Sequence, residues 1–226
     1  HVGLPSQEGD AVAVWGNSPT AHRGEGVAEA RDAPVVRVED APLRSLFPGR
    51  DGEPPLGLVI DHRAAHFDPT KPSDLEVLLA THSLDDTALL NRARICIARL
   101  QEAHLSKYAA IPLDVPALEA GYVVVIDQTE GDASVTASGA DRSRFLEMLY
   151  YAREEHPGAR IIIKTHPETH AGHRQGYFRE EDLNEGIEFL TNPVSPYTLF
   201  EGAIAVYTVS SGLGFEAIFA GHKPRV

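Results

Sequence analysis

Two apolar segments in the second half of the chain each end in a short polar signature. Residues 161–163 lead into Lys164-Thr165-His166-Pro167, and residues 203–208 lead into Val209-Ser210-Ser211-Gly212. In an open α/β sheet, ligands bind outside the carboxyl ends of the strands. A lysine, a histidine and hydroxyls at the start of a helix are groups that bind phosphate. The pattern predicts a phosphate site, and with it an enzyme that uses a nucleotide or a nucleotide sugar.

Each signature also has a plainer interpretation. Ser210 and Ser211 could simply cap a helix, because serine is a preferred N-cap residue. Lys164 and His166 could be solvated residues in a turn that Pro167 stiffens. We favour the phosphate interpretation because both signatures are expected in one sheet, where their ends would face the same ligand.

A third polar segment, residues 127–134, follows the apolar run at residues 122–126 and holds three carboxylates within six positions. A carboxylate at a strand end beside a phosphate site could act as a nucleophile or a general base. Asp132 is the first candidate and Asp127 the second. In the plainer interpretation Asp127 and Asp132 cap a turn and Ser134 begins a helix.

Two other ligand classes are not expected. His166, His170 and His173 lie in one loop, but they lack the fixed spacing of a metal site, so we expect no metal. Residues 211–214 contain two glycines without the third glycine and downstream acid of a dinucleotide fingerprint. His62 and His66 are expected to be surface or loop residues.

The elements that must position these residues alternate clearly in the second half. Strands are expected at residues 122–126, 160–163, 187–190 and 203–208. Helices are expected to begin at Asp141, with Phe145, Met148, Leu149 and Ala152 on one face, at Ser195-Pro196, and after Ser211 with an end at Gly221. Pro224-Arg225-Val226 resembles the start of a further strand. This alternation predicts a parallel sheet with helices on its faces.

The first half predicts a second, smaller α/β unit. Its expected strands are residues 11–15, 35–38 and 56–60, with a weak helix at 26–31. A capping-box-like start at Ser83 opens a helix on which Leu89, Ala93, Cys96 and Leu100 recur at helical spacing. Residues 111–116 resemble a linker. The predicted domains are therefore residues 1–110 and residues 117–226.

Composition narrows the class of protein. The formal net charge of −13 argues against general nucleic-acid binding, which requires clustered lysine and arginine. No apolar run approaches the ~20 residues that span a bilayer. Residues 1–6 show no secretory signal, and the single cysteine, Cys96, forms no internal disulfide. The cytoplasm is the expected compartment.

Six motifs, taken together and in order, carry a resemblance to a known family. They are residues 14–20 (VWGNSPT), 38–45 (VEDAPLRS), 68–73 (DPTKPS), 127–134 (DQTEGDAS), 164–167 (KTHP) and 210–216 (SSGLGFE). The chain resembles the bacterial capsule polysaccharide synthesis and export family, the KpsC-like β-Kdo transferases. Ala41-Pro42 departs from the family pattern of a glycine and an aromatic residue.

The resemblance implies a GT-B-like α/β fold, with two Rossmann-like domains of parallel sheets and a cleft between them. It implies transfer of Kdo from CMP-Kdo to a phospholipid-linked Kdo acceptor with retention, at the cytoplasmic face of the inner membrane. Possible contacts with that membrane and with capsule assembly proteins follow from the same resemblance. No metal or other cofactor is implied. Family modules start before Val12 and continue past Val226, so the chain is expected to be clipped at both ends.

The resemblance also assigns roles to residues. Asp132, Asp127 and His166 are the expected catalytic groups, and Glu39, Asp40 and Arg44 are expected on the acceptor side. The expected donor-nucleotide residues are Lys164, His166, Pro167, Ser210, Ser211, Gly212, Glu216 and Gln128. Two alternatives stay open: a nucleotide-sugar enzyme with a UDP or GDP donor or an epimerase, and a non-catalytic scaffold for capsule export.

Overall fold

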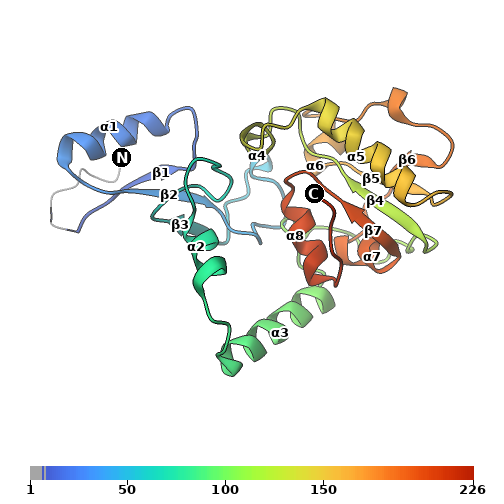
Figure 1. Cartoon of the computed structure of the whole chain (residues 1–226), viewed down its shortest axis with the longest axis horizontal. Coiled ribbons are helices and arrows are strands. Elements are labelled where there is room, and N and C mark those ends of the chain that lie inside the picture. Colours follow the sequence, from blue (N-terminus) through green and yellow to red (C-terminus); the bar gives the residue numbers. More distant parts are fainter. Residues whose placement is uncertain (1–6, 8) are drawn as a thin grey trace. The chain divides into compact units, whose positions relative to one another are not determined.

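The computed structural model describes residue 7 and residues 9–226, which form two compact units (Figure 1). The first unit contains residues up to Arg44 and residues 55–90, and the second contains residues 45–54 and 91–226. The predicted domains, residues 1–110 and 117–226, remain predictions. The prediction that residues 1–6 carry no secretory signal falls on positions outside the described residues.

The first unit is built on a three-stranded sheet in the order β1 (Val12–Trp15), β2 (Val35–Asp40), β3 (Leu58–Asp61). Helix α1 (Ala21–Arg31) connects the parallel strands β1 and β2. Strand β3 runs antiparallel to β2, so the prediction of parallel sheets throughout is wrong for this sheet. The reason is the connection at residues 41–57. It holds only the 3₁₀ turn η1 (Gly49–Asp51) and no crossover helix, which a parallel strand would need.

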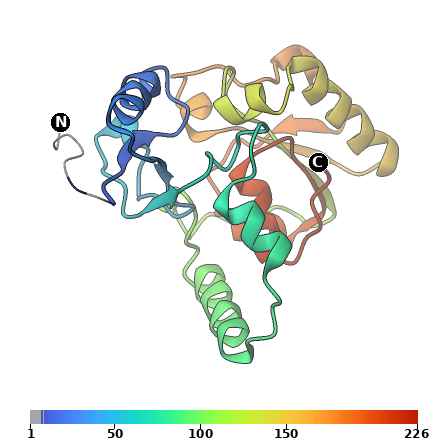
Figure 2. The same ribbon diagram turned by 60° about the vertical axis from the view of Figure 1, so that its left-hand side comes forward.

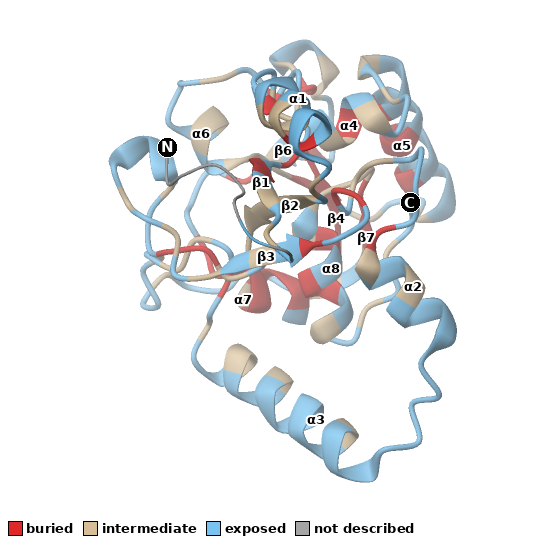
Figure 3. Ribbon diagram, turned by 90° about the vertical axis from the view of Figure 1, so that its left-hand side faces the viewer, coloured by how far each residue is buried: buried red, intermediate tan, exposed pale blue. Residues whose placement is uncertain are grey.

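Two helices follow β3, and the capping box lies at the start of the first helix, where it was not predicted. Helix α2 (Asp74–Thr81) carries the capping box, because Ser73 Oγ accepts the Glu76 amide at 3.2 Å and Glu76 Oε2 accepts the Ser73 amide at 2.7 Å. The capping-box-like start predicted at Ser83 is wrong. Helix α3 (Thr87–Glu102) instead begins after Asp86, whose Oδ1 accepts the Leu89 amide at 3.0 Å. None of the residues of α3 is buried (Figure 3).

The second unit contains a four-stranded sheet that is wholly parallel. Its order is β6 (Ile187–Phe189), β5 (Ile161–Lys164), β4 (Tyr122–Ile126), β7 (Ala203–Tyr207). Strand β4 lies between β5 and β7, and all five of its residues are buried. Burial on both faces explains its continuous apolar sequence.

Helices cover both faces of this sheet (Figures 1 and 2). Helix α5 (Arg142–Glu155) packs on the face to which Val123 and Val125 point. Helices α7 (Pro196–Glu201) and α8 (Gly212–Phe219) pack on the opposite face, against Val124 and Ile126. This layering is Rossmann-like, and it leaves the carboxyl ends of the strands to the connecting loops.

The predicted helix boundaries of this unit are largely confirmed. Asp141 caps α5 by accepting the Ser143 amide at 2.9 Å, and the predicted face of α5 is buried. Pro196 is the first residue of α7, and Gly221 follows the end of α8 with a φ of +94°. Arg225 pairs in parallel with Tyr207, as expected for the start of another strand. The short helices α4 (Ala133–Ala137) and α6 (Pro167–His170) and the turn η2 (Glu180–Asp182) complete the unit.

Candidate functional site

The predicted strand-end motifs of the second unit come together at the carboxyl end of its sheet. The order of the strands places β4 between β5 and β7, so the residues that follow all three are neighbours. The Asp127 amide donates to the Lys164 carbonyl at 3.0 Å. The next residue, Gln128, turns its side chain toward Ser210 on the other side. The site is therefore centred on the loop after β4.

Gln128 and Ser210 are joined by two hydrogen bonds. Gln128 Nε2 donates to Ser210 Oγ at 3.1 Å, and the Ser210 amide donates to Gln128 Oε1 at 3.0 Å. Ser134 Oγ lies 3.0 Å from Ser210 Oγ. Gln128 is 4% exposed, so these bonds form in a nearly dry environment and hold the loops after β4 and β7 together.

Ser211 lies at the start of α8. Its Oγ accepts the Leu213 amide at 3.2 Å, and it is the N-cap of the helix. Gly214 allows close packing of this helix on the end of β7, because a Cβ at that position would lie 2.6 Å from Thr208 Cγ2. Ser211 therefore does cap a helix, as its plainer interpretation predicted. The cap does not exclude an anion, since the first turn of a helix carries partial positive charge.

Lys164 is the last residue of β5, and its side chain is partly buried. Its Nζ donates to the Thr165 carbonyl at 2.8 Å. Burial lowers the pKa of Lys164 to about 8, and the negative charge of Glu216 partly opposes that effect. Lys164 is therefore only weakly held in its charged form near neutral pH.

His166 caps the short helix α6, and Pro167 is the first residue of that helix. His166 Nδ1 accepts the Glu168 amide at 3.2 Å, so the neutral ring carries its hydrogen on Nε2. Burial, and after it the positive charge of Lys107, lowers the pKa of His166 to about 4. The imidazole is consequently a neutral hydrogen-bond donor at pH 7.

Glu216 is buried one turn into α8. Its Oε1 accepts the Ser106 hydroxyl and the Lys107 amide, each at 3.2 Å. Its Oε2 is buried and has no hydrogen-bond partner among the described residues. Burial raises the pKa of Glu216, while the hydrogen bond from Ser106 and the charges of Lys107 and Lys164 lower it.

The two candidate carboxylates have different surroundings. Asp127 is 3% exposed, and its Oδ1 accepts the amides of Gln128 at 2.8 Å and Tyr177 at 2.9 Å. Burial raises the pKa of Asp127 to about 6. A Cβ at Gly176 would lie 2.0 Å from Asp127 Oδ2, so the backbone at Gly176 covers this oxygen.

Asp132, in contrast, is partly exposed and is the N-cap of α4. Its Oδ1 accepts the Ser134 amide at 2.8 Å and the Ser134 hydroxyl at 2.6 Å. Asp132 therefore acts as a cap, as its plainer interpretation predicted. Ser134 connects Asp132 to Ser210. Of the two carboxylates, Asp132 is the more accessible to a ligand.

The segment Ser106-Lys107-Tyr108 belongs to this region, although it was missed in the sequence. The Tyr108 ring meets His166 edge-on, with 6.1 Å between ring centroids. The Lys107 ammonium lies 5.7 Å from the centroid of the Tyr108 ring. No local pattern marks these residues, because a Lys-Tyr pair in an irregular segment is typical of any loop.

The three predicted acceptor-side residues all lie in the first unit. Arg44 Nε donates to Asp40 Oδ2 at 2.8 Å, so two of them form an ion pair. Glu39 lies against Gly16, where a Cβ would come within 1.7 Å of Glu39 Oε1. Their role toward an acceptor remains a prediction.

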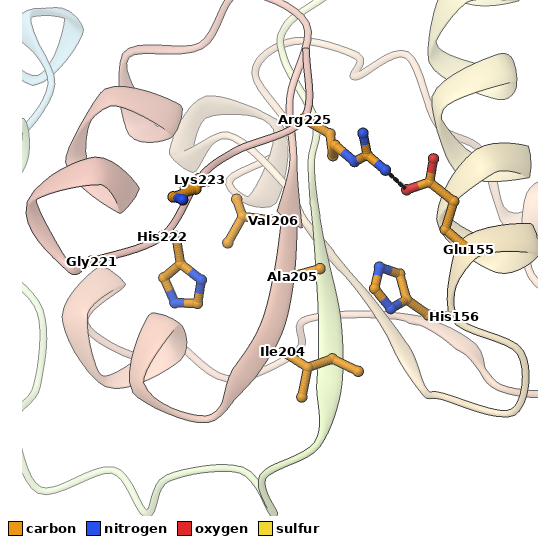
Figure 4. A pocket seen from close by; sticks show the side chains of 9 residues that line it. All are labelled: Glu155, His156, Ile204, Ala205, Val206, Gly221, His222, Lys223 and Arg225. Atoms are coloured by element: carbon orange, nitrogen blue, oxygen red, sulfur yellow. Dashed lines mark hydrogen bonds and ion pairs between the residues drawn. The ribbon is translucent and has the colours of Figure 1, made fainter.

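A surface pocket of about 450 Å³ lies beside β7 and contains none of the predicted site residues (Figure 4). The Arg225 guanidinium pairs there with Glu155 at 2.7 Å. His156, Ile204 and Lys223 also line it. The pocket is open and has no carboxylate, hydroxyl or amide from the strand-end motifs, so the chemistry argues for the strand ends instead.

Two further features bear on the class of protein. Across residue 7 and residues 9–226, no cluster of three or more histidine, cysteine, aspartate or glutamate side chains is arranged to hold a metal ion. In the same part of the chain, no helix combines the length and the apolar character that crossing a bilayer requires.

Comparison with known proteins shows the family of the chain. The sequence model of the family described as "Capsule polysaccharide biosynthesis protein" matches residues 10–114 and 114–225. LipA of Neisseria meningitidis, a capsule polysaccharide modification protein, is 35% identical over 99% of this chain. LpsZ of Rhizobium meliloti, a lipopolysaccharide-processing protein, is 32% identical over 96% of it. The chain spans 32% of the length of LipA and 50% of that of LpsZ.

Two solved structures of KpsC from Thermosulfurimonas dismutans share the fold. The β-Kdo 2,4 transferase matches with a TM-score of 0.83 and 33% identity, over 94% of this chain and 67% of that one. The β-Kdo 2,7 transferase matches with a TM-score of 0.63 and 28% identity, over 94% of this chain and 62% of that one. Because the family model covers nearly the whole chain, the chain belongs to the capsule polysaccharide biosynthesis protein family and is KpsC-like.

Proposed function

We propose that this chain carries the donor-binding core of a glycosyltransferase that moves Kdo from CMP-Kdo to a lipid-linked glycan acceptor in capsule synthesis. Its KpsC relatives are Kdo transferases, which supports the reaction class. The proposal rests on one observation: Gln128, Ser210 and Lys164 lie together at the carboxyl end of one parallel sheet. Because the chain spans only part of its relatives, the activity of the whole protein belongs to the proposal.

The donor phosphate would lie between the end of β5 and the start of α8. His166 Nε2 would donate to a phosphate oxygen, and the first turn of α8 would supply amide donors and partial positive charge. These groups stabilise negative charge on the departing CMP, which is the role that a metal ion fills in other transferases. The proposed reaction is therefore metal-independent. Glu216 Oε2, which lacks a partner among the described residues, would accept a ribose hydroxyl.

The proposed chemistry retains the anomeric configuration through a covalent intermediate. Asp132 attacks the anomeric carbon of Kdo as the bond from that carbon to the phosphate oxygen breaks, and CMP leaves with the electron pair. An acceptor hydroxyl then displaces Asp132, and its proton passes to a base. Asp127 is the weaker candidate, because Gly176 covers its Oδ2 and Oδ1 accepts two amides.

The remaining assignments follow the same family likeness. The architecture would be GT-B, with an acceptor-side domain at residues 1–110 and a donor-side domain at residues 117–226. Glu39, Asp40 and Arg44 would contact the acceptor. The protein would work at the cytoplasmic face of the inner membrane, peripherally attached and beside capsule assembly proteins.

Calorimetric titration of the chain with CMP, UDP and GDP, with and without EDTA, tests this function. We expect CMP to bind, to bind more tightly than UDP or GDP, and to be insensitive to EDTA. Tighter binding of UDP or GDP than of CMP would contradict CMP-Kdo as the donor and favour a UDP- or GDP-sugar. Loss of CMP affinity in EDTA would contradict metal independence. No affinity for any nucleotide, together with an exposed apolar patch large enough for a partner, would favour the alternative of a non-catalytic capsule-export scaffold.

A further inference from the structure

Glu216 fixes the segment Ser106–Tyr108 beside the candidate site. Its Oε1 accepts both the Ser106 hydroxyl and the Lys107 amide. On the other side of the segment, the Ser45 amide donates to the Lys107 carbonyl and the Ala109 amide donates to the Ser45 carbonyl, each at 3.2 Å. The backbone at Lys107 is thus held from two directions, which limits where its side chain can reach.

The ammonium of Lys107 lies near His166, one of the predicted phosphate-binding residues. This ammonium lies 5.7 Å from the centroid of the Tyr108 ring, and that ring meets His166 edge-on. The residue is exposed, and no ion pair among residue 7 and residues 9–226 includes it. The positive charge of Lys107 is felt at the His166 ring, whose pKa it lowers.

The other positive groups of the site are less able to balance a phosphate. Lys164 donates to the Thr165 carbonyl from a partly buried position, and its charge is partly compensated by Glu216. His166 is neutral at pH 7 because its pKa is about 4. A nucleotide phosphate brings at least one full negative charge, which a neutral donor and a compensated lysine leave unbalanced.

We propose that Lys107 is a further phosphate-binding residue, whose ammonium pairs with the 5′-phosphate of the nucleotide beside His166, and that Glu216 is the positioning residue that holds Lys107 there. This inference rests on the proposed function, since the ligand is the nucleotide named above. It adds a residue from a segment far from both strand-end motifs in the sequence.

The test compares Lys107→Met with Lys223→Met, an equal loss of charge at an exposed lysine outside the site. Each variant is titrated with CMP and with cytidine, which lacks the phosphate, at low and high salt. We expect Lys107→Met to bind CMP about tenfold more weakly, as for one lost charge-assisted contact, with a reduced dependence on salt. Its affinity for cytidine should not change. Lys223→Met should match the unaltered chain, and Lys107→Arg should keep most of the CMP affinity.

The inference is overturned if the unaltered chain binds CMP and Lys107→Met binds it equally well. It is also overturned if Lys107→Met weakens cytidine as much as CMP, because the residue would then shape the site without contacting phosphate. If the unaltered chain does not bind CMP, the proposed function itself fails, so the two failures are told apart by one control titration. Thermal unfolding of both variants checks that the exposed substitutions leave the fold intact.

Discussion

The Gln128 side chain both donates a hydrogen bond to Ser210 and accepts one from it. Nε2 of the glutamine donates to the serine hydroxyl at 3.1 Å, and its Oε1 accepts the serine amide at 3.0 Å. One buried side chain therefore holds the loop after β4 against the loop that starts α8. The same loops carry Asp132 and Ser211, so the relative position of the proposed nucleophile and the proposed phosphate site depends on this pair.

Replacing Gln128 with alanine should affect both folding and ligand binding. The partly buried Ser210 amide would lose its acceptor, so we expect the free energy of unfolding to fall by about 1 kcal/mol. We also expect weaker CMP binding, because the start of α8 would be less well positioned. Urea unfolding and calorimetry measure the two effects. Gln175→Ala, at an exposed glutamine, is the matched control and should change neither quantity.

Asp132→Asn should separate catalysis from binding. The amide keeps an oxygen that can cap α4, so stability and CMP affinity should change little, but the neutral group is a far weaker nucleophile. We expect Kdo transfer by the longest available form of the protein to fall by about a thousandfold or more. A transfer assay with CMP-Kdo measures this. Transfer that survives in Asp132→Asn and is lost in Asp127→Asn would exchange the roles of the two carboxylates.

The buried carboxyl of Asp127 should make stability depend on pH. Its pKa is about 6 in the folded protein and 3.8 ordinarily, so the folded state binds the proton more tightly. Between these values stability falls as pH rises, by about 3 kcal/mol in total at 1.36 kcal/mol per pKa unit. The difference in free energy of unfolding between Asp127→Asn and the unaltered chain should shift by that amount from pH 3.5 to pH 7, in favour of the variant. Urea unfolding at several pH values measures it, and a constant difference would show that Asp127 ionises as if exposed.

His166 should remain neutral throughout the ordinary range of pH. Its pKa is about 4, against 6.5 for an unperturbed histidine, because the partly buried ring is poorly solvated. The unfolded chain binds this proton more tightly, so His166 costs stability as pH falls from 6.5 toward 4. We expect its imidazole NMR signals to stay constant from pH 8 to pH 5, with assignment by the loss of those signals in His166→Gln. A midpoint near pH 6.5 would show that the His166 ring is solvated and would contradict its role as a neutral donor.

Local sequence determined much of the second unit. Asp141 begins α5 because its side chain caps the first turn, and Pro196 begins α7 because its backbone is already fixed in a helical φ. The apolar run of β4 predicted a strand buried on both faces, and that prediction is confirmed. The strand-end motifs of residues 164–167 and 210–212 come together because parallel neighbours of one strand must end at the same edge.

Tertiary structure decided what depends on distant partners. Strand β3 is antiparallel to β2 because the connection between them contains no crossover helix, which no local pattern predicted. Asp127 and Asp132 are equivalent as sequence letters, but packing against Gly176 buries one and leaves the other accessible. The segment at Lys107 is held beside the site by Glu216, more than a hundred residues away, and by Ser45, which both bind its backbone. Groups so far apart in the chain meet only when the whole unit packs. The free energy of that packing depends on many residues, so it cannot be predicted from the short sequence around either group.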